Sequence, residues 1–207
     1  MKKTSSRDRY VKDIFTKLGV SFKKGSTILD IGCGDGIITV FFREMFGLKV
    51  YGIDIYKSLL LDPSIKFKKG SIYKIPFKQN TFDYIFLKNI VHHVDEPEQR
   101  KDYLMKAFLE LKRVCKKNGK IIIIEANRYN PLFYPHMVIF GKHDHFRQSY
   151  FISLVNSVFP IAQFKFFEAH LYPFPPLIKV FKLYERLMEM FSPRAFLAYN
   201  VAIITNE

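Results

Sequence analysis

Apolar and polar positions follow two different periods along this chain. Short apolar runs bounded by turn residues predict buried parallel strands, and they stand at residues 27–32, 49–53, 65–69, 82–87 and 121–124. An apolar residue at every third or fourth position predicts an amphipathic helix, and this pattern covers residues 7–18, 37–46, 98–116 and 149–159. Strand-like runs at 163–169 and 198–205 bring the predicted strands to seven. Strands that alternate with helices are typical of an α/β fold with a mostly parallel sheet.

Two segments interrupt this alternation. Residues 127–147 are rich in aromatic side chains and irregular, and they follow the fifth predicted strand. Residues 171–191 begin LYPFPP and continue as a helix with one apolar stripe, formed by Leu177, Val180, Phe181, Tyr184, Leu187, Met188 and Phe191. Three interpretations of this stripe stay open: core packing, a lid, or a surface that rests on lipid.

A glycine-rich loop stands between the first predicted strand and the helix that follows it. Its glycines are Gly32, Gly34 and Gly36. Glycines at such a junction permit a tight turn and let the backbone approach a ligand closely. The dinucleotide fingerprint needs its third glycine at position 37, where Ile37 stands. The spacing therefore indicates a cofactor other than a dinucleotide, one without a pyrophosphate.

An acidic residue ends the second predicted strand. Asp54 follows Gly36 by 18 residues, and in nucleoside-binding βαβ units a carboxylate at this place accepts hydrogen bonds from ribose hydroxyls. A loop aspartate that caps the next helix is the alternative. The strand and the glycine loop before it favour the ribose role.

These motifs resemble those of class I S-adenosylmethionine-dependent methyltransferases. The run ILDIGCGDGIIT resembles their motif I, and YGIDIY resembles their acidic motif II. The stretch GSIYKIPFKQNTFDYIFLKNIVHHV is similar to the ubiquinone-biosynthesis-like branch (methyltransferase type 11). The resemblance covers residues 20–125 and implies S-adenosylmethionine as cofactor. It also implies a Rossmann-like, seven-stranded, mostly parallel sheet with an antiparallel last strand, helices on both faces and insertions that cover the substrate.

The resemblance further implies which residues contact the cofactor: Asp30, Gly32, Cys33, Gly34, Gly36, Asp54, Ile55, Ser71, Ile72 and Asn89. One position departs from the family pattern, because Ser71 follows Gly70 where an aspartate is frequent. A serine still makes one hydrogen bond to adenine, and the backbone of Ser71 and Ile72 offers others. Asn89 is expected to contact the methionine end of the cofactor through its backbone.

A pair of histidines follows the fourth predicted strand, at the sheet edge where α/β proteins bind ligands. Methyl transfer needs a base only when the nucleophile is protonated at neutral pH. His93 matches the histidine of the family best, so it is the first candidate base and His92 the second. The alternative is a histidine that caps or packs the next helix. Glu125 and Asn127, which end the fifth strand, are expected to border the substrate.

No metal-ligand pattern stands out, so no metal is predicted. The candidate ligands of the first insertion lack the spacing of a helical pair: they are His136, His143, Asp144 and His145. Cys33 and Cys115 lie far apart and form no CxxC pair. This cysteine usage predicts a reducing, cytoplasmic location.

The net charge of +14 raises the question of a nucleic-acid partner. Most of the excess is lysine spread along the chain, whereas arginine, which reads bases and phosphates best, is scarce. Nucleic acid thus stays open as a partner without being favoured. The chain also contains neither an apolar run typical of a secretory signal nor 18 consecutive apolar residues. A peripheral contact with a membrane stays open, and the oligomeric state is not predicted.

We therefore predict a single methyltransferase domain over residues 1–207. Its parts are an N-terminal helix at 7–18, a cofactor-binding core at 20–126 and substrate-cover insertions at 127–147 and 171–195. The predicted activity is methylation of a small-molecule or lipid-like acceptor on oxygen or carbon. The alternatives are an RNA methyltransferase, and a binding protein that kept the fold without catalysis. The intact loop with Asp54 disfavours the last.

Overall fold

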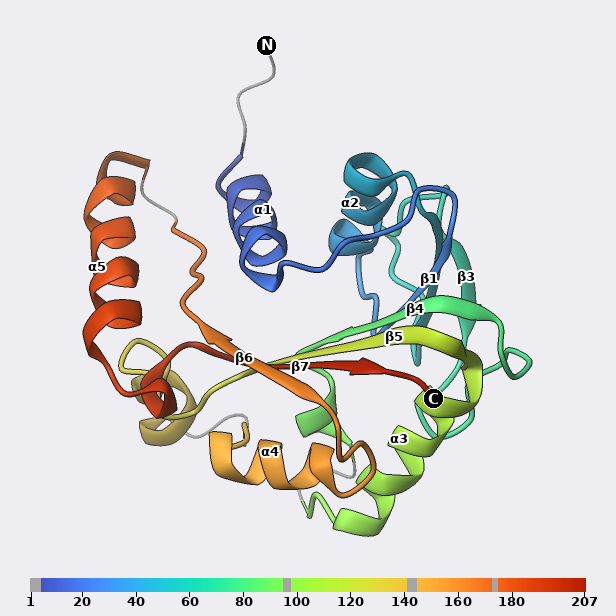
Figure 1. Cartoon of the computed structure of the whole chain (residues 1–207). Coiled ribbons are helices and arrows are strands. Elements are labelled where there is room, and N and C mark those ends of the chain that lie inside the picture. The colour runs from blue at the N-terminus through green and yellow to red at the C-terminus, as the bar shows by residue number, and fades with distance from the viewer. Residues whose placement is uncertain (1–4, 95–97, 141–144, 173–174) are drawn as a thin grey trace.

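The computed structural model contains one seven-stranded sheet with helices packed on both of its faces (Figure 1). It describes residues 5–94, 98–140, 145–172 and 175–207. The strands are β1 (Thr27–Ile31), β2 (Lys49–Asp54), β3 (Lys66–Lys69), β4 (Phe82–Lys88), β5 (Cys115–Ala126), β6 (Gln163–Phe167) and β7 (Tyr199–Thr205). Their order across the sheet is β3-β2-β1-β4-β5-β7-β6. The first five strands are parallel, and β7 is antiparallel to both β5 and β6. The predicted fold class is confirmed.

The helices are α1 (Ser6–Leu18), α2 (Ile37–Phe46), α3 (Lys101–Val114), α4 (Gln148–Asn156) and α5 (Ile178–Phe191). Figure 1 shows α1 and α2 on one side of the sheet, α3 and α4 on the other, and α5 beside α1 at the edge of the molecule. Within the described ranges, no helix is both long enough and apolar enough to cross a bilayer.

The central strands contribute to two hydrophobic cores, one on each face of the sheet. Successive side chains of a strand point to opposite faces. Ile121 and Ile123 therefore pack in the core that holds α3 and α4, whereas Ile122 and Ile124 pack in the core that holds α1 and α2. All four isoleucines are fully buried. Burial on both faces explains why β5 contains a continuous apolar run rather than an alternating one.

The boundary between α3 and β5 differs from the prediction. The sequence indicated a helix to residue 116, but α3 ends at Val114 and β5 begins at once. Asn118 has a φ of +61°, and the pairing between β4 and β5 shifts register in this region. The turn residues thus form an irregularity inside a 12-residue strand.

The two predicted insertions occupy different connections. Residues 127–147 follow β5 and contain a π-helical turn at Pro135–Ile139. Residues 171–195 lie between β6 and β7 and contain α5. Both connections leave the cofactor-binding half of the sheet, β1 to β4, uninterrupted.

Candidate active site

The glycine loop between β1 and α2 has three residues in the left-handed region. The φ values of Gly32, Gly34 and Gly36 are +72°, +52° and +77°. A side chain on Gly32 would collide with Ile90, since its Cβ would lie 2.1 Å from the Cδ1 atom. A Cβ on Gly34 would meet nothing within 4 Å. Gly32 is therefore required by packing, whereas Gly34 borders open space into which a ligand can approach the backbone.

Asp54, at the carboxyl end of β2, supports this loop directly. Its Oδ2 atom accepts a hydrogen bond from the backbone N–H of Gly34 at 3.0 Å, and Oδ1 accepts one from Tyr56 N–H at 3.3 Å. A carboxylate has about four lone-pair positions, so each oxygen keeps the capacity to accept a hydroxyl proton. The position fits the predicted ribose contact.

A cleft of about 420 Å³ opens at the carboxyl ends of β1, β2 and β4. This volume lies within the range of about 300–1,000 Å³ that is usual for small-molecule sites. Six of the predicted residues line it: Gly32, Asp54, Ile55, Ser71, Ile72 and His93. Sequence reasoning missed the other lining residues, which are Ile31, Ile53, Gly70, Tyr73, Ile90 and Val94. All six missed residues lie within two positions of a predicted one. Extending each predicted motif by two residues on either side would therefore have included them.

Other predicted cofactor residues lie behind the wall of the cleft. Asp30 is buried, and this burial raises the pKa of its carboxyl group to about 7. The Cys33 sulfur packs against Gly52, and burial raises the pKa of this thiol to about 12, so it is not a nucleophile at neutral pH. The Asn89 side chain accepts a hydrogen bond from Ala126 N–H at 3.0 Å. These side chains hold the loops in place and leave backbone atoms to face a ligand.

Serine at position 71 has a local role. Its Oγ accepts a hydrogen bond from Tyr73 N–H at 3.3 Å, and Ser71 pairs with Lys74 in an isolated bridge. The turn that an aspartate often occupies in the family is thus closed by a serine. The serine also lines the cleft.

The two histidines after β4 occupy different environments. His93 is exposed and lines the cleft, whereas His92 is 1% exposed and its Nδ1 lies 2.7 Å from Glu125 Oε2. Glu125 Oε1 also accepts hydrogen bonds from the N–H groups of Ile90 and Val91, at 2.9 and 2.7 Å. Glu125 is fully buried, so the expectation that it borders the substrate is wrong. It fixes the turn that presents His93 to the cleft.

Three side chains around this turn form a cluster that could hold a metal ion. In the described part of the chain, His92, Glu125 and His145 are the group whose candidate ligand atoms lie within 4.8 Å of one another. The ring centroids of His92 and His145 lie 3.8 Å apart with their planes tilted by 32°, and the Glu125 carboxyl already accepts hydrogen bonds from two backbone amides. We interpret this histidine–glutamate cluster as a support for the turn. His143 and Asp144 lie outside the described residues.

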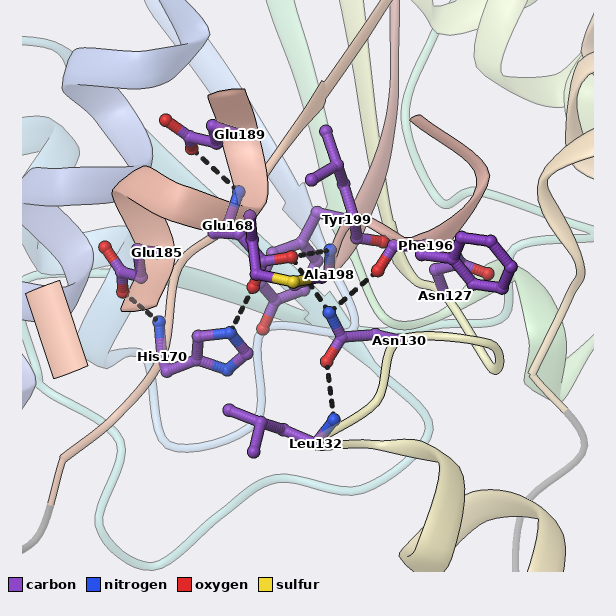
Figure 2. A network of polar contacts seen from close by, with 12 residues as sticks. Asn127, Asn130, Leu132, Glu168, His170, Glu185, Glu189, Phe196, Ala198 and Tyr199 are labelled. Carbon is purple, nitrogen blue, oxygen red and sulfur yellow. Dashed lines mark hydrogen bonds and ion pairs between the residues drawn. The ribbon is translucent and has the colours of Figure 1, made fainter. Parts of the chain in front are cut away.

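A second buried network connects the two insertions with β7 (Figure 2). Glu168 Oε1 accepts hydrogen bonds from the Asn130 side chain at 2.9 Å and from Ala198 N–H at 3.0 Å, and its Oε2 contacts His170 Nε2. The Asn127 side chain donates hydrogen bonds to the carbonyl oxygens of Ala195 and Leu197. Asn127 is fully buried, so it too does not border the substrate.

Aromatic side chains gather where α1, β4 and β7 meet. The hydroxyl groups of Tyr10 and Tyr199 lie 2.5 Å apart, and Lys88 Nζ lies 5.4 Å from the centre of each ring. Phe133, from the first insertion, packs edge-on against Tyr199 and His170. This cluster lies beyond the end of β4, on the side where the insertions lie.

The glycine loop, Asp54 and the turn after β4 all fall inside a segment with a known counterpart. Residues 29–123 match the family model described as "Methyltransferase domain". The family resemblance of the motifs is thereby confirmed, and the matched segment contains the whole cleft.

Known relatives agree with this assignment. An uncharacterized methyltransferase of Schizosaccharomyces pombe is 34% identical over 55% of this chain and 44% of its own length. A demethylmenaquinone methyltransferase of a Geobacillus species is 30% identical over 59% of this chain and 58% of its own length. The chain thus spans about half the length of these curated relatives.

Solved structures show the same fold. The crystal structure of a SAM-dependent methyltransferase from Archaeoglobus fulgidus superimposes with a TM-score of 0.67 at 18% identity. It covers 98% of this chain and 95% of that one. The aligned region therefore extends well beyond residues 29–123.

Proposed function

We propose that the protein is an S-adenosylmethionine-dependent methyltransferase whose acceptor is a small molecule with an apolar portion. The observation that carries this proposal is the cleft that Gly32 of the glycine loop, Asp54 and the exposed His93 line together. Asp54 and the glycine loop would bind the nucleoside, and Ser71 with Ile72 would bind its base. When bound, S-adenosylmethionine supplies an electrophilic methyl group.

The chain's own contribution to the chemistry is alignment and proton removal. Holding donor and acceptor in line can lower the barrier by about 7–11 kcal/mol. His93 would take the proton of an acceptor hydroxyl or an activated carbon at an imidazole nitrogen, as a general base. Glu125 would act as a positioning residue, because it holds the turn on which His93 stands.

The acceptor side supports an apolar molecule. Phe133, Tyr10 and Tyr199 pack together beyond β4, and Tyr129 stacks on Tyr134 in the same insertion as Phe133. Apolar and aromatic walls with a few polar groups are typical of small-molecule sites. The name of the Geobacillus relative, a demethylmenaquinone methyltransferase, also supports an apolar acceptor methylated on carbon or oxygen. The buried thiols of Cys33 and Cys115 form no disulfide and support the cytoplasm as the proposed compartment.

A methyl-transfer assay tests this proposal. Purified protein with S-adenosylmethionine labelled in its methyl group is incubated separately with lipid extract, metabolite extract and tRNA, at about 200 mM salt. We expect label in the lipid or metabolite fraction. Incorporation into tRNA alone would refute the proposed acceptor class and favour the RNA methyltransferase.

The His93→Ala variant tests the base. Turnover should fall by about 10²–10⁴-fold, while the affinity for S-adenosylhomocysteine stays within about threefold of wild type. His93→Gln is the matched control, because it keeps a polar side chain of similar size but cannot act as a base at neutral pH. Wild-type turnover in His93→Gln would exclude proton removal by His93.

A further inference from the structure

Helix α5 turns its polar side toward the protein. Glu185 is 2% exposed, and it accepts hydrogen bonds from Lys182 Nζ at 2.6 Å, from Tyr172 OH at 2.6 Å and from His170 N–H at 3.1 Å. Figure 2 shows Glu185 directed at His170 from the helix. The inner face of α5 is therefore held by charged and polar contacts rather than by an apolar core.

A second set of contacts fixes the same face against α1 and β6. Lys17 of α1 forms an ion pair with Glu189 at 2.8 Å, and Asp13 of α1 forms one with Lys182 at 2.5 Å. Glu189 also accepts a hydrogen bond from Glu168 N–H at 2.9 Å. Turning α5 about its axis would break these contacts and leave Glu185 without partners, so the rotation of the helix is set.

The opposite face of α5 carries an exposed apolar stripe. These side chains, called the outer stripe below, recur at helical spacing: Val180, Leu183, Leu187, Met190 and Phe191, which are 62%, 56%, 46%, 64% and 74% exposed. A surface helix ordinarily buries its apolar stripe and exposes its polar one. Contiguous exposed apolar side chains indicate a binding surface.

The charges beside the outer stripe indicate what it binds. Lys179 and Arg186 are exposed and lie seven positions apart, and so on the same side of the helix, next to Leu183 and Met190. The two acidic residues of α5, Glu185 and Glu189, are engaged on the inner face. The outer face thus combines apolar side chains with cations only, which is the composition of a helix that lies on an anionic lipid surface.

The length of α5 and the total charge fit the same partner. Its 14 residues extend over about 21 Å, less than the roughly 30 Å of a bilayer core, so the helix would lie in the plane of the interface. The net charge of +14 adds long-range attraction to anionic headgroups. A second copy packed through the outer stripe would bring two Lys179 and two Arg186 side chains into one interface, which disfavours a dimer there.

We propose that the outer stripe of α5 docks the protein on an anionic phospholipid bilayer. Figure 1 shows α5 at the edge of the molecule, where the sheet and the other helices leave its outer side open. The ion pairs with α1 keep the stripe turned outward. This proposal does not depend on which acceptor is methylated.

Vesicle sedimentation of the full chain tests the proposal. The vesicles are phosphatidylcholine alone, or phosphatidylcholine mixed with phosphatidylglycerol at roughly 2:1. We expect binding to the mixed vesicles that weakens as salt is raised, and little binding to phosphatidylcholine alone. In the double variant Leu183→Ser/Leu187→Ser, the partition coefficient on mixed vesicles should fall by about tenfold or more.

Two exposed apolar residues elsewhere provide a matched control. Leu109 on α3 and Ile161 before β6 are 55% and 65% exposed, and Leu109→Ser/Ile161→Ser should leave vesicle binding unchanged. Equal losses in the two double variants, or no binding by the wild type, would overturn the proposal. Sedimentation velocity adds the rival outcome: a wild-type dimer that Leu183→Ser/Leu187→Ser dissociates, without vesicle binding, would assign the stripe to a second copy of the chain.

Discussion

Removal of the Asp54 carboxylate is the sharpest test of the cofactor site. Asp54→Ala deletes the acceptor that faces the cleft and also the one that receives the Gly34 N–H at 3.0 Å. The substitution therefore removes a ribose contact and loosens the glycine loop. Asp54→Asn separates the two effects, because its amide oxygen can still accept from Gly34 while the negative charge is lost.

The expected loss follows from the strength of hydrogen bonds to charged acceptors. Such a bond contributes about 1.5–3 kcal/mol, so Asp54→Ala should weaken cofactor binding by roughly 10- to 150-fold. Asp54→Asn should lie nearer tenfold, since one neutral acceptor remains. Because Asp54 is only partly buried, we expect little change in the free energy of unfolding.

Isothermal titration calorimetry with S-adenosylhomocysteine measures the effect, and urea unfolding reports whether the fold is intact. Asp35→Ala is the control, because Asp35 belongs to the same loop but accepts from Ile37 N–H and does not line the cleft. Its affinity should stay within about threefold of wild type. If Asp54→Ala also stays within threefold, or if NAD binds more tightly than S-adenosylhomocysteine, the assignment of the loop is refuted.

Three further outcomes are expected. Gly34→Val should abolish S-adenosylhomocysteine binding in calorimetry, because a branched side chain at a φ of +52° would occupy the open side of the loop; retained affinity would contradict this. Burial raises the pKa of Asp30 from 3.8 to about 7, so the folded state holds this proton more tightly than the unfolded chain and the resulting stability is lost as pH rises through about 7. In Asp30→Asn, the free energy of unfolding should therefore fall less between about pH 4 and 7 than it does in the wild type. If urea unfolding shows the same pH dependence for both proteins, the raised pKa of Asp30 is excluded as its cause. Methyl transfer should survive chelation, and loss of turnover that one divalent ion restores would make the histidine–glutamate cluster a metal site.

The cofactor half of the fold could be predicted from the sequence because local signals agree there. Strand β1, the glycine loop and α2 have matching bounds in the prediction and the structure, to within one residue. A buried strand, glycines that need a positive φ and an amphipathic helix each leave a separate mark in the chain. Of the ten predicted cofactor residues, five line the cleft, and of the two candidate bases, His93 does.

The wrong predictions concern side chains whose orientation is set by residues far away in the sequence. The predicted stripe of α5 joined Val180 and Phe181 on one face, yet Val180 points outward and Phe181 stacks on Tyr172. Periodicity shows that a stripe exists, but the partners of Glu185 come from α1 and from the segment after β6, and they set which side turns inward. Glu125 was misplaced for a similar reason, since it binds backbone amides, which carry no sequence signal.

The position of β7 in the sheet determines the order in which the strands can pair during synthesis. Among the described residues, β7 is the last strand along the chain, but it lies between β5 and β6, and β6 pairs with no strand other than β7. Strands β1 to β5 can pair as soon as residue 126 has left the ribosome, whereas β6 must wait for residues 199–205. Until then, one edge of β5 and all of β6 present unpaired backbone groups that can join another chain. A ribosome that stalls before residue 199 would therefore release a nascent chain whose cofactor half has formed and whose exposed strands favour aggregation.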